Sequence, residues 1–244
     1  MNKRKRLSKP RLLAMLATTA ASGYATVIRP RLVRWGATEE EAGLPLPGDS
    51  VVERPRYVAN HAITINAPAA AVWPWLVQMG QGRGGLYSYD WLENIMRMRI
   101  HSADRIIPEF QDLKPGDTFR LVPEDYFTDL HFEVISVEPE HALVMRSPGS
   151  PAENFPERKP FVSWALALVR LDGHTTRLIA RTRSDFGHTF SDLMWNKYGL
   201  EPVHFIIERR MLLGIKRRAE ASVTTGGGGL GDAVPVCGPA RAAA

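Results

Sequence analysis

Two carboxylates, Asp90 and Glu93, lie three residues apart in the stretch SYDWLEN, where a short helix would place them on one side. General acid and base catalysis can use such a pair, with one carboxyl group donating a proton and the other accepting it. Exposed carboxylates on helices are far more common than catalytic pairs. The pattern therefore allows an enzyme without requiring one.

The seven histidines are the other residues that could transfer protons or bind a metal. None belongs to an H-E-x-x-H pattern, and His101 with Asp104 forms a single weak pair. The G-x-S-x-G stretch of a serine nucleophile elbow does not occur in the sequence. We therefore predict no metal ligand, no cofactor and no catalytic residue.

Gly80, Gly82 and Gly85 fit the G-x-G-x-x-G pattern of dinucleotide-binding loops. Such a loop directly follows a strand and opens a helix within a parallel βαβ unit. Here the glycines follow a helical pattern, and Gly80 stands where a glycine commonly ends a helix. The sequence predicts a joint between two short helices, with a nucleotide site as the weaker alternative.

Basic residues are concentrated at the start of the chain, where residues 1–34 carry nine Lys and Arg and no Asp or Glu. Since the whole chain has 31 basic and 26 acidic residues, the remainder carries 22 against 26, a net charge near −4. A nucleic-acid-binding domain needs basic residues on its folded body, so nucleic acid is not an expected partner. The lone cysteine, Cys237, excludes an intramolecular disulfide.

Residues 12–28 carry no charge and lie between Arg11 and Arg29. As a helix they would span about 26 Å, slightly short of a hydrocarbon core of roughly 30 Å. Six basic residues precede them, which predicts a retained membrane anchor with a cytoplasmic N-terminus. The alternatives are a cleaved signal peptide on a secreted protein, and a surface-lying or disordered arm on a cytoplasmic one.

Composition divides the rest of the chain. Pro and Gly in LPLPGDS and three successive glutamates indicate a linker, whereas four successive glycines near the C-terminus indicate a disordered tail. The predicted parts are a basic arm at 1–11, the anchor at 12–28, a linker at 29–55, a folded domain at 56–221 and a disordered tail at 222–244.

The order of hydrophobic patterns in the folded domain predicts an α+β layout. Alternation over 56–67 indicates a strand, and helical spacing follows over 67–79 and 88–98. Five strand-like segments come next, and a long helix over 201–220 closes the domain. The short, turn-rich connections favour antiparallel pairing, so one curved sheet must cover the long helix.

Three stretches of this domain carry a family resemblance: INAPAAAVWPWLVQMGQGRGGLYSYDWLEN, IHSADRIIPEFQDLKPGDTFRL and EPVHFIIERRMLLGIKRRAE. Together with RPRLVRWGATEEE before them, they resemble an uncharacterised bacterial subgroup of the SRPBCC superfamily, over residues 29–221. That superfamily includes START lipid-transfer domains, pollen-allergen-like proteins and polyketide cyclases. The resemblance implies a helix-grip fold, in which about seven antiparallel strands hold a C-terminal helix around a cavity. Function transfers poorly, because the superfamily includes carriers, sensors and enzymes.

Small residues on two neighbouring strand-like segments predict space beside the long helix. The faces concerned carry Ser163, Ala165 and Ala167 in one segment, and Leu178, Ala180 and Thr182 in the next. The opposite face of the second segment carries arginines and must point outward. Close packing of the helix, helped by Gly214, explains the small residues equally well.

An apolar cavity of this kind needs aromatic and apolar walls and a few polar groups that select its ligand. Each polar candidate could equally be an ordinary structural hydrogen-bonding group, and most of the aromatic residues should belong to the core. The predicted ligand-binding residues are Trp75, Tyr87, Tyr89, Asp90, Trp91, Asn94, His101, Trp164, Phe205 and Met211.

We therefore predict a membrane-tethered protein that binds a small hydrophobic molecule, a lipid or polyketide-like compound. The sequence favours binding over catalysis without deciding whether the protein is an enzyme. One alternative is a cyclase- or dehydratase-type enzyme acting on such a ligand, which needs Asp90 or His101 buried against the cavity. Another is an interaction module with a filled core. The sequence indicates no particular protein partner.

Overall fold

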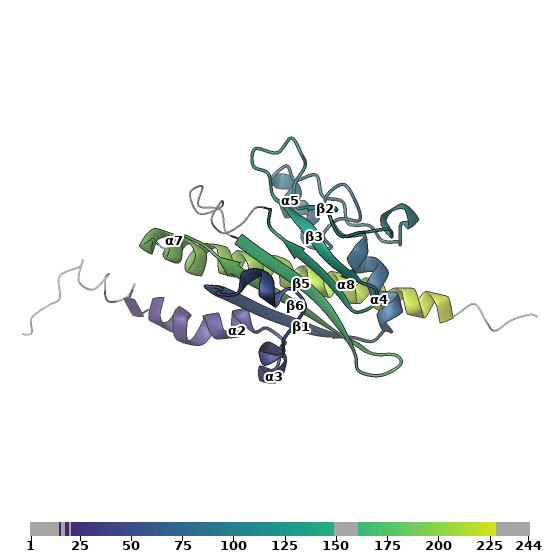
Figure 1. Cartoon of the computed structure of the whole chain (residues 1–244), viewed down its shortest axis with the longest axis horizontal. Coiled ribbons are helices and arrows are strands. Elements are labelled where there is room, and N and C mark those ends of the chain that lie inside the picture. The colour runs from purple at the N-terminus through teal and green to yellow at the C-terminus, as the bar shows by residue number, and fades with distance from the viewer. Residues whose placement is uncertain (1–14, 16–17, 20, 149–160, 188, 228–244) are drawn as a thin grey trace, which may run out of the picture.

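A curved antiparallel sheet wraps around one long helix in the computed structural model, which describes residues 15, 18–19, 21–148, 161–187 and 189–227. Figure 1 shows this helix, α8 (Glu201–Gly227), running along the sheet. The spatial strand order is β1-β6-β5-β4-β3-β2. The strands are β1 (Tyr57–Ile65), β2 (Thr118–Arg120), β3 (His131–Glu138), β4 (Ala142–Arg146), β5 (Phe161–Arg170) and β6 (Thr176–Asp185).

The predicted α+β helix-grip fold is confirmed, with six strands among the described residues where the resemblance implies about seven. Every strand pair is antiparallel. Short helical segments precede, interrupt and follow the sheet. They are η1 (Tyr24–Ile28), α2 (Arg29–Val33), α3 (Glu39–Gly43), η2 (Asp49–Val52), α4 (Ala69–Val77), α5 (Asp90–Ile95), η3 (Pro108–Phe110), α7 (Phe190–Trp195) and η4 (Asn196–Leu200).

The glycine-rich stretch forms the turn between α4 and α5. Gly80 and Gly85 exchange two backbone hydrogen bonds of 3.0 Å, and both have positive φ angles, +124° and +78°. Such angles favour glycine over any residue with a side chain. Arg83 folds back from this loop and donates to the carbonyl oxygens of Val77 and Phe110. The loop therefore joins two helices, as the sequence predicts.

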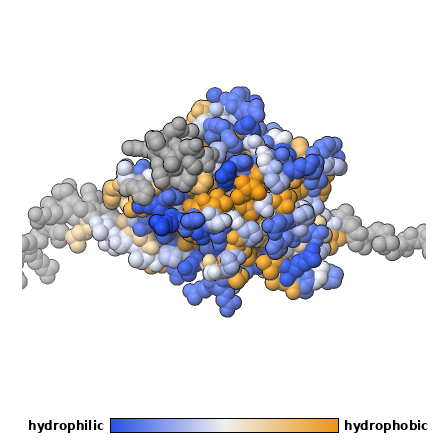
Figure 2. Space-filling model, viewed as in Figure 1, coloured by the Kyte–Doolittle hydropathy of each residue, from blue (hydrophilic) through white to orange (hydrophobic). Residues whose placement is uncertain are grey.

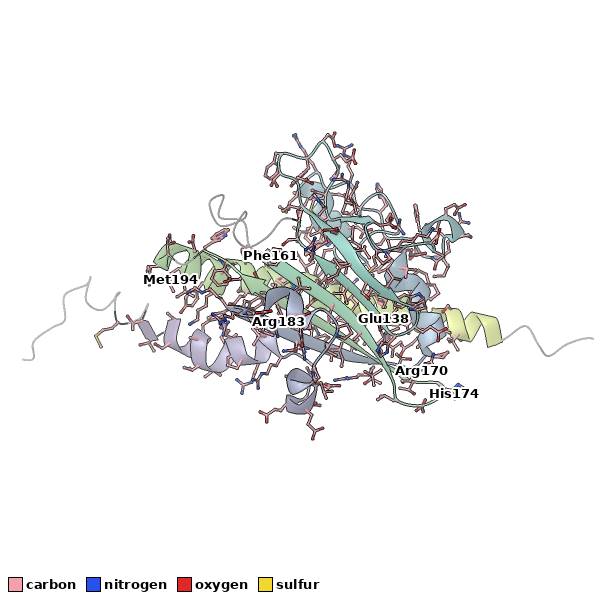
Figure 3. All side chains as sticks on the ribbon, in the orientation of Figure 1. Glu138, Phe161, Arg170, His174, Arg183 and Met194 are labelled. Carbon is pink, nitrogen blue, oxygen red and sulfur yellow. The ribbon has the colours of Figure 1, made fainter. Side chains whose placement is uncertain are left out.

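The two faces of β5 differ from the sequence prediction. The pairing of Trp164 with Thr182 places both on the inner face, toward α8. Ser163, Ala165 and Ala167 therefore lie on the outer face, and the prediction that they border a cavity is wrong. These small residues instead leave room for η2, which packs against β5 from outside. Phe161 and Arg170, labelled in Figure 3, mark the two ends of this strand.

Residues 36–53, which we call the N-terminal strap, cover part of the outer face of the sheet. They belong to the segment predicted as a linker, 29–55, yet they carry α3 and η2. The arginines of β6 point outward as predicted and bind this strap: Arg183, labelled in Figure 3, donates to the Val52 carbonyl oxygen at 2.9 Å. The strap is thus fastened to the sheet, whereas the domain boundary at residue 56 stays a prediction.

The outer face also carries hydrophobic surface. Figure 2 shows hydrophobic residues gathered near the middle of the visible face, with hydrophilic residues around them. Gly48 of the strap lies so close to Val144 of β4 that a Cβ atom there would come within 2.4 Å of a Val144 methyl carbon. The strap therefore packs tightly on the outer face beside this surface.

The prediction of a membrane anchor over residues 12–28, with a cytoplasmic N-terminus, is corrected by the structure. In the part of the chain that the structure describes, no helix is long and apolar enough to cross a membrane. The described end of the segment packs on the body: the Tyr24 ring lies 5.2 Å from that of Tyr198, and its hydroxyl donates to the Lys197 carbonyl oxygen. Thr26 and other small polar residues lower the hydropathy of this stretch.

Helix α8 continues past the predicted end of the folded domain at residue 221 and ends at Gly227. The first six residues predicted as tail are therefore helical. The rest of the predicted tail, 228–244, and the predicted basic arm, 1–11, lie outside the described residues.

Candidate functional site

A cavity of about 380 Å³ lies between the inner face of the sheet and the N-terminal half of α8. This volume falls within the 300–1,000 Å³ that is typical of ligand cavities. Side chains from strands β1, β3, β5 and β6, from two loops, from η4 and from α8 build a mostly apolar wall. Residues of this wall include Leu86, Leu121, Phe132, Val162, Trp164 and Met211.

The polar end of the cavity is built by Tyr57 of β1, Thr182 of β6, and His204 and Glu208 of α8. The Tyr57 hydroxyl lies 3.1 Å from His204 Nδ1, and the Thr182 hydroxyl lies 3.4 Å from His204 Nε2. His204 and Glu208 are four residues apart, so helical geometry places them on one face. Their closest atoms, His204 Nε2 and Glu208 Oε1, are 3.5 Å apart.

His61 of β1 holds Glu208 from behind. The Leu32 carbonyl oxygen accepts a hydrogen bond of 2.8 Å from His61 Nε2, and because a carbonyl carries no hydrogen, this nitrogen must be protonated. The other ring nitrogen, Nδ1, contacts Glu208 Oε2. Both side chains are almost completely buried, so the proton between them is withdrawn from water. Imidazole and carboxylate together are neutral wherever that proton resides.

The surroundings set the charges at this end. Burial opposes ionisation of Glu208, but the imidazoles of His204 and His61 outweigh it and hold the pKa of Glu208 below its ordinary value of 4.5. Burial also opposes a charge on His204, yet the Glu208 carboxylate raises the pKa of His204 above its ordinary 6.5. Burial and the nearby Glu208 and Glu201 carboxylates raise the pKa of Tyr57, so its hydroxyl stays neutral.

A second carboxylate of the cavity wall, Glu201, is held by the N-terminal helix. Arg29 donates two hydrogen bonds to it, at 2.6 Å from Nε and 2.9 Å from an η nitrogen. The side chain of Glu201 is 5% exposed. Helix α2 therefore supports both acids of the cavity. Arg29 binds Glu201 directly, and the Leu32 carbonyl oxygen holds His61, which contacts Glu208.

Of the ten predicted ligand-binding residues, Trp164 and Met211 line this cavity. Trp164 lies on the inner face of β5 and Met211 lies on α8, one helical turn beyond Glu208. Phe205 does not line it but packs beside it, with its ring 5.6 Å from that of His61. Whether these residues bind a ligand stays a prediction.

The other seven predicted residues lie on or near α4 and α5 and do not line this cavity. Trp75 and Tyr87 are buried in the main core, and Tyr89 lies beneath Arg210. The remaining four have structural partners or face solvent: Asp90 accepts from Ser102, Asn94 bonds to the backbone of Ile100, and Trp91 and His101 are exposed. The enzyme alternative needs Asp90 or His101 buried against the cavity. Neither residue lines it, so neither supports that alternative.

The ten predicted residues do not include His204, Glu208 or His61, although the sequence carries a signal for them. His204 and Glu208 fall on the same helical stripe as Met211 and Ile215, which are buried. His61 falls on the alternating positions of β1 that include Ile65, also buried. Polar residues in core positions are exceptions to binary patterning, and such exceptions often mark functional sites.

No family model matches the chain, and no curated protein matches its sequence. Among solved structures, norcoclaurine synthase from Thalictrum flavum is 14% identical with a TM-score of 0.41, over 75% of this chain and 95% of that chain. Protein MLL2253 from Mesorhizobium loti is 15% identical with a TM-score of 0.38, over 68% and 98%. Protein NE0264 from Nitrosomonas europaea is 14% identical with a TM-score of 0.40, over 73% and 99%. Membership in the SRPBCC superfamily stays a prediction.

Proposed function

We propose that this protein binds a small, mostly apolar molecule between the sheet and α8, with the polar group of that molecule at His204. One observation carries the proposal: an apolar cavity of about 380 Å³ that ends in the buried Glu208 and the partly exposed His204. Ligand cavities commonly combine apolar walls with a few convergent polar groups. A cavity of this size also disfavours the alternative of an interaction module with a filled core.

The size of the cavity limits the ligand. Its volume equals that of about 13 water molecules at liquid density. A molecule of one or two rings fits within this volume, whereas a two-chain lipid would extend beyond it. The proposal therefore retains the hydrophobic ligand of the sequence prediction but moves the ligand class toward compact molecules.

Naphthalene is a suitable probe for binding, because it is apolar and fits the volume. We expect the full chain to bind it with a Kd of about 0.1–1 mM, the range for ten non-hydrogen atoms without a polar contact. Val162→Phe should weaken this binding at least about tenfold, because the larger side chain fills part of the cavity. The measurement is a titration followed by naphthalene fluorescence.

Val169→Phe is the matched control, because Val169 lies on the same strand and its side chain is 41% exposed. It should leave the Kd of naphthalene unchanged. Absence of binding to the wild-type chain, or equal weakening by both variants, would contradict the proposal.

A second candidate function is acid–base catalysis of the cyclase or dehydratase kind, and the position of His204 in the cavity favours it. In a dehydration, charged His204 would protonate a departing hydroxyl group, while Glu208 would remove a proton from the neighbouring carbon. One C–O bond and one C–H bond break, a C=C bond forms, and water leaves. A general base works best with a pKa near the working pH, and the lowered pKa of Glu208 makes it a weak one. Binding is for this reason the first proposal.

An apolar β-hydroxy ketone, 4-hydroxy-4-phenylbutan-2-one, tests the second candidate. Its dehydration gives a conjugated ketone, which can be followed by ultraviolet absorbance. If the candidate is correct, the wild-type chain accelerates this reaction over buffer at least about 100-fold, and His204→Gln removes the acceleration. Equal rates for wild type and His204→Gln would exclude it, while leaving the binding proposal to its own test.

A further inference from the structure

Two atoms at the polar end of the cavity, one on Glu208 and one on His204, lack hydrogen bonds of normal length within the part of the chain that the structure describes. Glu208 Oε1 is buried and accepts no hydrogen bond among the described residues, although Oε2 of the same carboxylate contacts His61. His204 Nε2 has contacts of 3.4 Å to Thr182 and 3.5 Å to Glu208 Oε1. Bonds between charged donors and acceptors normally measure about 2.7–2.9 Å. A donor and an acceptor thus face each other beyond their preferred distance.

Neither group can easily close this gap. His61 holds Glu208 from one side and is itself fixed by the Leu32 carbonyl oxygen. Tyr57 holds the opposite nitrogen of the His204 ring. Leaving a buried carboxylate oxygen without a partner costs stability, so a ligand that supplied the missing donor would gain affinity.

A hydroxyl group is the ligand chemistry that suits both atoms. It can accept a hydrogen bond from His204 Nε2 and at the same time donate its own hydrogen to Glu208 Oε1. An ether or a ketone can only accept, so it leaves the carboxylate oxygen without a donor. A carboxylate carries no hydrogen either, so it would leave Glu208 Oε1 without a donor and place a second carboxylate oxygen against it.

We propose that the ligand is an uncharged alcohol or phenol whose hydroxyl group lies between His204 Nε2 and Glu208 Oε1. This inference rests on the proposed binding function and names its ligand class. The apolar part of the ligand lies along the wall formed by Trp164, Val162 and Met211. His204 and Glu208 are then the residues that determine specificity.

A series of naphthalenes with nearly equal apolar surface tests the inference on the full chain at about pH 6.5. The probes are naphthalene, 2-naphthol, 2-methoxynaphthalene and 2-naphthoate, and the readout is the Kd of each. We expect 2-naphthol to bind about 10–100-fold more tightly than 2-methoxynaphthalene, because hydrogen bonds to charged groups are the stronger ones. We also expect 2-naphthoate to bind more weakly than 2-naphthol.

Glu208→Gln should reduce the preference for 2-naphthol over 2-methoxynaphthalene to about threefold or less, and this ratio is compared within the variant so that any general change in affinity cancels. Glu220→Gln is the matched control, because Glu220 also forms an i,i+4 pair on α8, with Lys216, but does not line the cavity. If Glu208→Gln does not fold, the ratio of the Kd of 2-methoxynaphthalene to that of 2-naphthol on the wild-type chain tests the inference by itself.

Equal affinities of the wild-type chain for 2-naphthol and 2-methoxynaphthalene would overturn the hydroxyl inference, provided that naphthalene still binds. Tighter binding of 2-naphthoate than of 2-naphthol would overturn it as well. Failure of every probe, naphthalene included, would instead contradict the proposed binding function itself. The two failures are therefore distinguishable.

Discussion

Replacing Arg181 with Met is expected to lower the free energy of unfolding by about 3–5 kcal/mol, the usual cost of removing one partner from a buried ionic network. The Arg181 side chain is 3% exposed, on the outer face of β6 beneath the N-terminal strap. A change at this position therefore affects the attachment of the strap as well as the sheet.

All five N–H groups of the Arg181 guanidinium have acceptors. Nε donates to Asn60 at 2.6 Å, one η nitrogen to the Leu44 carbonyl oxygen and Asp49, and the other to the carbonyl oxygens of Glu41 and Ala42. Methionine occupies similar space but donates nothing. The three carbonyl oxygens would then lose this donor, Asp49 would keep the Leu46 N–H and Arg183 but lose its closest guanidinium group, and the strap would lose four hydrogen bonds to the sheet.

Urea unfolding of the full chain measures the effect, and hydrogen exchange of residues 36–53 shows whether the strap detaches. Arg170→Met on the neighbouring strand is the control, because the Arg170 side chain is 65% exposed in its pair with Glu140. That variant should lose less than about 1 kcal/mol. Equal losses for both variants would contradict the role assigned to Arg181.

Replacing Glu93 with Gln is expected to stabilise the protein at pH 8 by about 1–3 kcal/mol. Glu93 is 4% exposed, and both of its carboxylate oxygens are buried. Burial and the adjacent Asp90 carboxylate raise its pKa from 4.5 to about 7, partly offset by the Ser88 hydroxyl. The folded protein therefore favours the neutral acid, which glutamine imitates.

The direction of the pH effect follows from proton binding. Between pH 4.5 and about 7 the folded state holds a proton on Glu93 that the unfolded state has already released. The contribution of Glu93 to stability is therefore complete below pH 4.5 and is lost as the pH rises through about 7. Glu93→Gln removes this loss, so the variant and the wild type should differ most above pH 7.

Denaturant unfolding at several pH values between 4.5 and 8 tests this expectation. Glu124→Gln is the control, since its side chain is 79% exposed and should leave the pH profile unchanged. A Glu93→Gln variant that is less stable than the wild type at pH 8 would show that the carboxylate has a partner in solution.

The strands and the long helix were predictable because their patterns are local. Alternation in β1 and helical spacing in α8 depend on neighbouring residues, which the sequence displays directly. The faces of β5 were not predictable in the same way. Small residues such as Ser163 and Ala165 indicate that another segment packs closely on that face. The local sequence does not show that this segment is the strap, which lies more than 100 residues earlier in the chain.

The candidate site was predictable only in its apolar part. Trp164 and Met211 are large apolar residues in segments whose patterns predict a strand and the long helix, which made them natural candidates for the wall. The pair His204 and Glu208 has the spacing of an ordinary exposed helix pair, and its meaning depends on His61, which the chain places 147 residues from Glu208. Contacts over such separations are set by the topology of the fold, not by local sequence.

The most direct test of the account is native mass spectrometry of the full chain after exposure to a small-molecule extract of its source cells. We predict a reproducible adduct of one compact molecule on the wild-type chain, lost in Val162→Phe and retained in Val169→Phe. A bare mass for the wild type, or an adduct equally abundant on both variants, would contradict binding in the cavity between the sheet and α8.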